Sequence, residues 1–79
     1  MLAEALEHLV RGIVAHPDDV RVRDKQLRSL RMLEVRVNAS DIGKVIGRRG
    51  RVASELRTVI SALAGRQRVR IDFVDVKNR

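Results

Sequence analysis

The sequence predicts a two-layer α+β domain in which a mixed three-stranded sheet is covered on one face by three helices. Three observations lead to this prediction. The chain has 79 residues, of which 44% are hydrophobic and 34% charged, so we expect one domain over residues 1–79 with a single core. Apolar residues recur at helical spacing in three segments and alternate with polar residues in three others. The order of these segments is helix, strand, strand, helix, helix, strand.

The first helix is indicated by Leu2, Leu6, Leu9 and Ile13, which follow one another at steps of four, three and four residues. This spacing places them on one face of an amphipathic helix. We expect the helix to end before Pro17, because the residue that precedes a proline avoids helical backbone angles.

Two strands are predicted next, at residues 20–23 and 33–37, because apolar and polar residues alternate strictly in both. The basic connection at residues 25–29 lacks the Asn-Gly or Asp-Gly pair of a tight hairpin, so the ends of these strands are less well defined by the sequence. Since the connection is short, the two strands should pair antiparallel.

The second half of the chain predicts two helices and a last strand. Residues 38–40 offer helix caps, and Asp41 is placed near the positive end of a short helix that stops at Gly47. A third helix follows Gly50 and ends at Gly65, which we expect to be a left-handed cap. Its apolar positions are Val52, Leu56, Val59, Ile60 and Leu63. The last strand, at residues 69–73, is reached through a helical crossover and should therefore lie parallel to its neighbour.

Alternation along the strands also predicts which residues face the helices. The inward-facing set is Val20, Val22, Leu33, Val35, Val37, Val69, Ile71 and Phe73. The other side of the sheet, here called the open face, should carry Arg21, Arg23, Arg36, Arg68 and Arg70, interrupted by Glu34 and Asp72. We favour a solvated face with cross-strand ion pairs, and the alternative is an auxiliary contact for a nucleic acid or for an acidic partner.

The charge of the chain points to a polyanionic partner. Seventeen Lys and Arg residues against ten Asp and Glu residues give a net charge of +7, of which residues 1–19 contribute −3 and the remaining residues +10. Nucleic acid is the commonest such partner and a membrane surface the next, although arginine-rich proteomes also produce basic proteins. The sequence contains no cysteine and no apolar run long enough for a bilayer. We therefore expect a cytoplasmic protein without membrane contact.

The most informative segment joins the two central helices and contains Gly47-Arg48-Arg49-Gly50, here called the glycine loop. Glycines permit a tight turn and let a sugar-phosphate backbone approach the main chain closely. The N–H groups that open the next helix add partial positive charge, and Arg48 and Arg49 add full charges. Such a site holds an anion without reading a base sequence.

The segment Val45-Ile46-Gly47-Arg48-Arg49-Gly50 resembles the V/I-I-G-x-x-G signature of the KH-domain family, whose loop clamps the backbone of single-stranded nucleic acid. The order of elements matches the type II, bacterial variant, and the resemblance covers essentially the whole chain. The length is similar to that of the small stand-alone KH proteins of bacteria. Many KH domains have isoleucine or valine three residues after the second glycine, where this chain has Ala53.

The resemblance implies a module that binds single-stranded RNA. We expect no catalytic residues, cofactor or metal. On this basis the backbone is held by Gly47, Arg48, Arg49 and Gly50. An apolar floor for bases is implied at Ile42, Val45 and Ile46, with Val35 or Val37, although a plain core role is an alternative for Val45 and Ile46. Positive charge along the phosphate track is implied at Lys44, Arg51 and Arg57.

Other classes of function fit less well. Glycines at 43, 47 and 50 match neither nucleotide-binding spacing, and we expect His8 and His16 to be surface residues rather than catalytic groups or ligands. Phe73 is predicted to lie in the core, which leaves no aromatic surface for base stacking. A helix-turn-helix would not require the strands.

The remaining alternative is a KH-fold docking or dimerisation module with little RNA binding of its own. Small size and the apolar sector of the third helix, flanked by Ala53, Ile60 and Ala64, suggest self-association. The resemblance adds a complex with a larger KH-containing RNA-binding protein. We expect a post-transcriptional regulator or RNA chaperone, with no small-molecule substrate.

Overall fold

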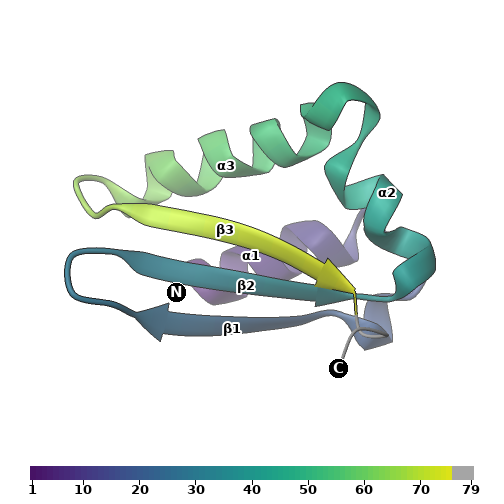
Figure 1. Cartoon of the computed structure of the whole chain (residues 1–79), viewed down its shortest axis with the longest axis horizontal. Helices are drawn as coiled ribbons and strands as arrows, with labels where there is room; N and C mark the ends of the chain where they lie inside the picture. The colour runs from purple at the N-terminus through teal and green to yellow at the C-terminus, as the bar shows by residue number, and fades with distance from the viewer. Residues whose placement is uncertain (76–79) are drawn as a thin grey trace.

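The computed structural model describes residues 1–75, which form one sheet with helices on one side (Figure 1). The helices are α1 (Leu2–Arg11), α2 (Ile42–Ile46) and α3 (Arg51–Ala64), and the strands are β1 (Arg21–Gln26), β2 (Arg31–Val37) and β3 (Val69–Asp75). Single 3-10 turns lie at Pro17–Asp19, Ala39–Asp41 and Arg48–Gly50. The predicted fold class and order of elements are confirmed. Among residues 1–75, none of the helices combines the length and apolar character that crossing a membrane requires.

The sheet has the strand order β1-β2-β3, with β1 antiparallel and β3 parallel to β2, as predicted. The first two strands extend further than their apolar alternation indicated, because Lys25 and Gln26 pair with Met32 and Arg31. Ladder hydrogen bonds join backbone groups, so they continue through polar residues near the end of the hairpin. The turn is closed by the N–H of Leu27, which donates to the carbonyl of Leu30 at 2.7 Å.

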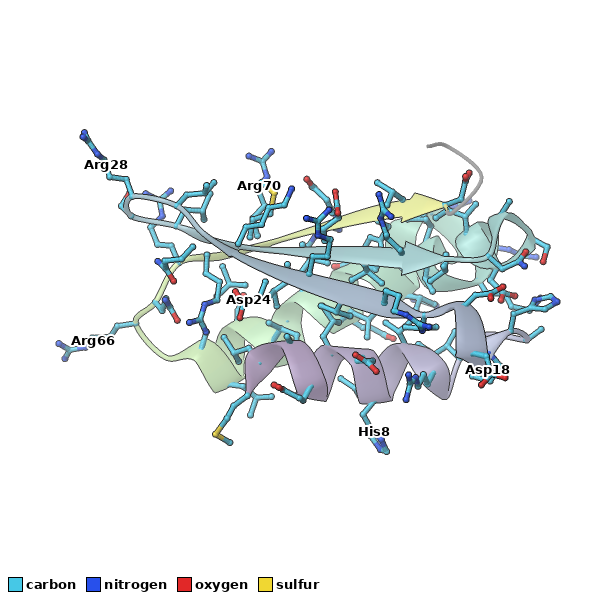
Figure 2. The ribbon with its side chains drawn as sticks, turned by 90° about the horizontal axis from the view of Figure 1, so that it is seen from below. His8, Asp18, Asp24, Arg28, Arg66 and Arg70 are labelled. Atoms are coloured by element: carbon cyan, nitrogen blue, oxygen red, sulfur yellow. The ribbon has the colours of Figure 1, made fainter. Side chains whose placement is uncertain are left out.

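The core lies between the inner face of the sheet and the helices. Figure 2 shows α1 and α3 beneath the sheet, while Figure 1 shows α2 where β2 and β3 end. The apolar side chains that lose all contact with solvent come from the helices, the strands and the residue that precedes β1: Leu6, Val10, Val20, Leu33, Val35, Val37, Val45 and Ile60. Burial of this apolar area is the main force that holds the two layers together.

Helix α1 ends at Arg11, earlier than the predicted boundary at Pro17. Glycine at position 12 costs about 1 kcal/mol relative to alanine inside a helix. The N–H groups of Ala15 and His16, which a longer helix would use internally, donate instead to the carboxylate of Asp41. The chain therefore leaves the helix for a bond to a distant residue before the proline is reached.

Helix α3 is rotated relative to its predicted orientation. Ala53, Leu56 and Ile60 are buried, whereas Val59 and Leu63 are 44% and 60% exposed. The steps of three and four residues that connect the buried positions define the inward stripe, and Val59 and Leu63 lie on its flank. Gly65 ends the helix with a positive φ of 66°, as expected of a glycine stop, but its ψ of −120° is not left-handed helical, which corrects that prediction.

Candidate functional site

The glycine loop connects α2 directly to α3 in a backbone conformation that few residues adopt. Gly47, Arg49 and Gly50 have φ angles of 77°, 58° and 74°. Arg49 is a non-glycine residue in the left-handed region, which is uncommon. A hydrogen bond of 3.1 Å from the Gly50 N–H to the Gly47 carbonyl closes the turn. Three positive φ angles within four residues fold the chain back sharply and hold both arginines out from the body of the domain.

The two glycines have different surroundings. A Cβ added to Gly47 would lie 2.5 Å from Cγ2 and 2.8 Å from the backbone N of Val52, in the first turn of α3. The same addition at Gly50 would meet nothing within 4 Å. Gly47 therefore lets the loop pack against α3, while Gly50 leaves open space beside the backbone.

Positive side chains surround this open space. Lys44, Arg48, Arg49 and Arg51 are all exposed, and within residues 1–75 only Lys44 of these four forms an ion pair, with its Nζ 3.8 Å from Oδ1 of Asp41. A surface hollow of about 780 Å³ is lined by Arg48, Arg49, Gly50, Arg51, Val52, Ser54 and Glu55. No side chain caps the first turn of α3, so its N–H groups add partial positive charge to the hollow.

Fewer residues reach the surface of the apolar floor than the sequence predicts. Ile42 and Ile46 are one turn apart on α2 and are half-buried at the surface. Val45, Val35 and Val37 are fully buried in the core, where a base cannot reach them. The floor prediction for these three valines is therefore corrected, because α2 turns Val45 inward and the alternation of β2 places Val35 and Val37 on the face that the helices cover.

Arg57 lies apart from the loop cations, on the flank of α3 that faces β3. Its guanidinium carbon is 5.7 Å from the centroid of the Phe73 ring, within the range of a cation–π contact. A hollow of about 100 Å³ between α3 and β3 is lined by Arg57, Ile60, Ser61, Val69 and Ile71. Phe73 is half-buried rather than enclosed in the core, so strand alternation alone misjudged its exposure.

Asp41 is a buried residue whose role the sequence did not reveal. Its carboxylate accepts hydrogen bonds from the N–H groups of Ala15 and His16 at 3.1 and 2.9 Å, and Nδ1 of His16 lies 3.1 Å away. Burial raises the pKa of Asp41, but the hydrogen bonds from Ala15 and His16 outweigh it and leave this pKa below its ordinary value.

Asp41 lies at the N-terminal end of α2, as predicted, but its side chain accepts no hydrogen bond from that helix. Asn38 fulfils the capping prediction, because its side chain accepts the N–H of Ser40 at 2.9 Å. Asp41 fastens the α1–β1 connection to the start of α2. Its partners are 25 and 26 residues away, so no local pattern could have indicated them.

Neither histidine lines the hollow beside the glycine loop. His8 projects from α1 into solvent, as Figure 2 shows. His16 is exposed as expected but is also anchored to Asp41.

Comparison with known proteins identifies the family. The chain matches the family described as KhpA/KhpB, KH domain, over residues 3–76. It is 63% identical over 76 residues to RNA-binding protein KhpA of Streptomyces coelicolor, a match that covers 96% of this chain and 95% of the relative. The relative of the same name from Leifsonia xyli is 60% identical over 75 residues, covering 95% and 99%.

A more distant relative, RNA-binding protein KhpA of Halalkalibacterium halodurans, is 44% identical over 72 residues, covering 89% of this chain and 95% of the relative. No solved structure gives a significant match. The family match spans nearly the whole chain and includes the glycine loop, and the mixed sheet with three helices is consistent with a type II KH fold. The chain therefore belongs to the KhpA/KhpB family of KH-domain proteins.

Proposed function

We propose that this protein binds RNA by clamping the backbone of a single strand at the glycine loop. The observation that carries the proposal is the open space beside Gly50, bordered by the exposed guanidinium groups of Arg48 and Arg49. The names of the relatives, each an RNA-binding protein KhpA, support RNA as the polyanion.

In this proposal the main chain and the side chains contribute separately. A phosphate approaches Gly50 where no Cβ obstructs it and meets the N–H groups of the first turn of α3. Arg48 and Arg49 form charge-assisted hydrogen bonds to its oxygens, while Lys44 and Arg51 attract the neighbouring phosphates. These contacts fix the position of the strand but do not read its sequence.

Bases of the clamped strand turn toward α2, where Ile42 and Ile46 offer a small apolar surface. Arg57 extends the positive charge toward β3. Since this surface provides no stack of exposed aromatic rings, one domain binds modestly and gains from being paired with another. A homodimer or a complex with a larger KH-containing RNA-binding protein would supply that second site. A role as a cytoplasmic post-transcriptional regulator or RNA chaperone fits such binding.

The test is the double substitution Arg48→Asp and Arg49→Asp. We expect it to abolish binding to single-stranded RNA in a fluorescence anisotropy titration, because two attractive charges become repulsive. The melting curve should change little, since both side chains are exposed and aspartate tolerates the left-handed angles of position 49. Arg28→Asp with Arg66→Asp makes the same change in net charge far from the loop and is the matched control. Retained RNA binding by the loop variant would exclude the clamp.

A second candidate function is favoured by the apolar flank of α3. Val59 and Leu63 are exposed there, and Leu63 borders a hollow of about 410 Å³ that also includes Leu2 and Ala5 of α1. A docking or dimerisation module would use this flank and bind little RNA. RNA titration of the wild type, together with sedimentation of the Leu63→Glu variant, distinguishes the two functions. A docking module would bind little RNA and would lose self-association on substitution, whereas the clamp would bind RNA at the glycine loop whether or not it self-associates.

A further inference from the structure

The open face of the sheet carries a set of cations that the glycine loop does not use. Strand register places side chains in three rows across the sheet. The first row is Arg21, Arg36 and Val74, the second is Arg23, Glu34 and Asp72, and the third is Lys25, Met32 and Arg70. Five cations therefore share this face with two acids. Lys25 is an addition to the predicted set, and Arg68 precedes β3 rather than lying within the sheet.

Most of this positive charge is not neutralised by the protein itself. Within residues 1–75, the face has a single ion pair, between Nε of Arg36 and Oε1 of Glu34 at 3.7 Å. The guanidinium of Arg21 donates to two backbone carbonyls, which leaves its charge in place. Arg23, Lys25 and Arg70 are exposed and form no ion pair in the described part of the chain.

The shape and polarity of the face also restrict what it can bind. Figure 2 shows that α1 and α3 lie on the opposite side of the sheet and that Arg70 projects away from them. Met32 and Val74 are the apolar residues of the three rows, and both are already half-buried. A protein partner that needs an apolar core would find little surface here.

The arrangement of charges suits a phosphate backbone. Four of the five cations are arginines, whose planar groups form paired hydrogen bonds with phosphate oxygens. The two acids lie in the middle row. The first and third rows carry only positive charges and are four residues apart along each strand, a distance of about 13 Å. Such spacing allows contact with phosphates on either side of the acidic row.

We propose that the open face is a second, sequence-independent phosphate-binding surface, which holds a segment of RNA beyond the part clamped at the glycine loop. The inference rests on the proposed function only in taking RNA as the ligand. It assigns to the sheet a role separate from that of α2 and α3, so that one molecule contacts two stretches of the same RNA.

The experiment compares two RNA lengths and two variants of the full chain. The face variant is Lys25→Gln with Arg70→Gln, which changes one of the two basic rows, and the control variant is Arg28→Gln with Arg66→Gln, whose exposed side chains lie at the loop tips (Figure 2). One probe is an RNA of about 4 nucleotides, the number that a KH loop clamps, and the other is an unstructured RNA of about 20 nucleotides. Dissociation constants are measured at several salt concentrations.

We expect the face variant to bind the short RNA as the wild type does and the long RNA about tenfold more weakly. Its logarithmic salt slope on the long RNA should be shallower by about 1.4, because two phosphate contacts are lost. The control variant should weaken long-RNA binding less than twofold. An equal loss in both variants, or a loss on the short RNA as well, would overturn the proposal.

Two further results distinguish RNA binding at the open face from the clamp and from recognition of an acidic protein. If the wild type fails to bind the short RNA while the face variant still loses affinity for the long one, the clamp is wrong and the open face stands. If the face variant keeps full RNA affinity but loses binding to polyglutamate, the face recognises an acidic protein and the RNA proposal is rejected.

Discussion

The two glycines that border the glycine loop differ in what their backbone conformation requires. Gly47 has φ 77° and ψ 171°, a combination that is almost restricted to glycine, whereas Gly50 at φ 74° and ψ 16° lies in the left-handed region that asparagine also visits. Only Gly47 is also confined by Val52. Gly47 is therefore needed for packing of the loop, whereas Gly50 leaves the surface beside the loop unobstructed.

Substitution of each glycine by alanine should separate these two roles. Gly47→Ala is expected to destabilise the protein by about 3 kcal/mol or more, since backbone strain adds to overlap with the main chain of α3. Gly50→Ala should cost about 1 kcal/mol but weaken RNA binding, because its methyl group enters the space proposed for a phosphate. Urea denaturation and RNA titration of both variants check this. An RNA affinity of Gly50→Ala equal to that of the wild type would argue against close approach of the backbone.

Asp41 gives the stability of the fold a dependence on pH. The pKa of its carboxyl is lower in the folded chain than its ordinary value of 3.8, so the ionised form stabilises the native state. This contribution is complete at pH values above the unfolded pKa and is lost as the pH falls through the folded pKa. We expect Asp41→Asn to have a lower melting temperature at pH 7 and a smaller decline between pH 5 and pH 3. Parallel pH dependence in both proteins would contradict the assignment.

At the level of elements, helices and strands form where their apolar patterns indicate. Their ends, however, depend on competition between hydrogen bonds within an element and hydrogen bonds to other parts of the chain. Helix α1 ends at Arg11 because Asp41 accepts hydrogen bonds from the N–H groups of Ala15 and His16. The β1–β2 ladder extends to Gln26 and Arg31 because backbone pairing needs no apolar residue. Helix α3 has two adjacent apolar flanks, one with Ala53 and Ile60 and the other with Val59 and Leu63. Packing against α1 and the sheet buries the first and leaves the second exposed.

The end of α1 provides a test of this competition. Gly12 has helical angles, and a Cβ there would make only ordinary contacts, the nearest at 3.5 Å from the carbonyl O of Leu9. Gly12→Ala should therefore stabilise the protein by about 0.4–1 kcal/mol by reducing the freedom of the unfolded chain. Gly65→Ala is the contrasting variant and should destabilise, because position 65 has a positive φ. Thermal melts of both variants give the comparison, and a lower melting temperature for Gly12→Ala would contradict this interpretation.

Across the whole molecule, charge is divided between two surfaces. The cations of the glycine loop lie where α2 meets α3, and those of the open face lie on the side of the sheet that the helices leave uncovered. Glu7 pairs with Arg11 on α1, while Asp41 contacts His16 and lies 3.8 Å from Nζ of Lys44. An RNA strand therefore meets an attractive potential at both surfaces.

The salt dependence of binding reports how much of this charge is used. A short single strand held only by the glycine loop should neutralise about three to four phosphates, which gives a logarithmic salt slope of roughly −2 to −3. Anisotropy titrations between low and moderate salt supply the slope. A value near zero would mean that the strand is held by something other than its phosphates.

The sequence by itself determined the fold class, the order of elements and the glycine loop with its two arginines. These features depend on local periods and on turn chemistry, which a single chain displays directly. Tertiary structure decided that Val45 is buried, that Phe73 meets Arg57 and that Asp41 bonds to Ala15 and His16. Each of these depends on contacts between residues at least 16 positions apart in the chain, or on the depth of a residue below the surface, and neither is encoded in a local pattern.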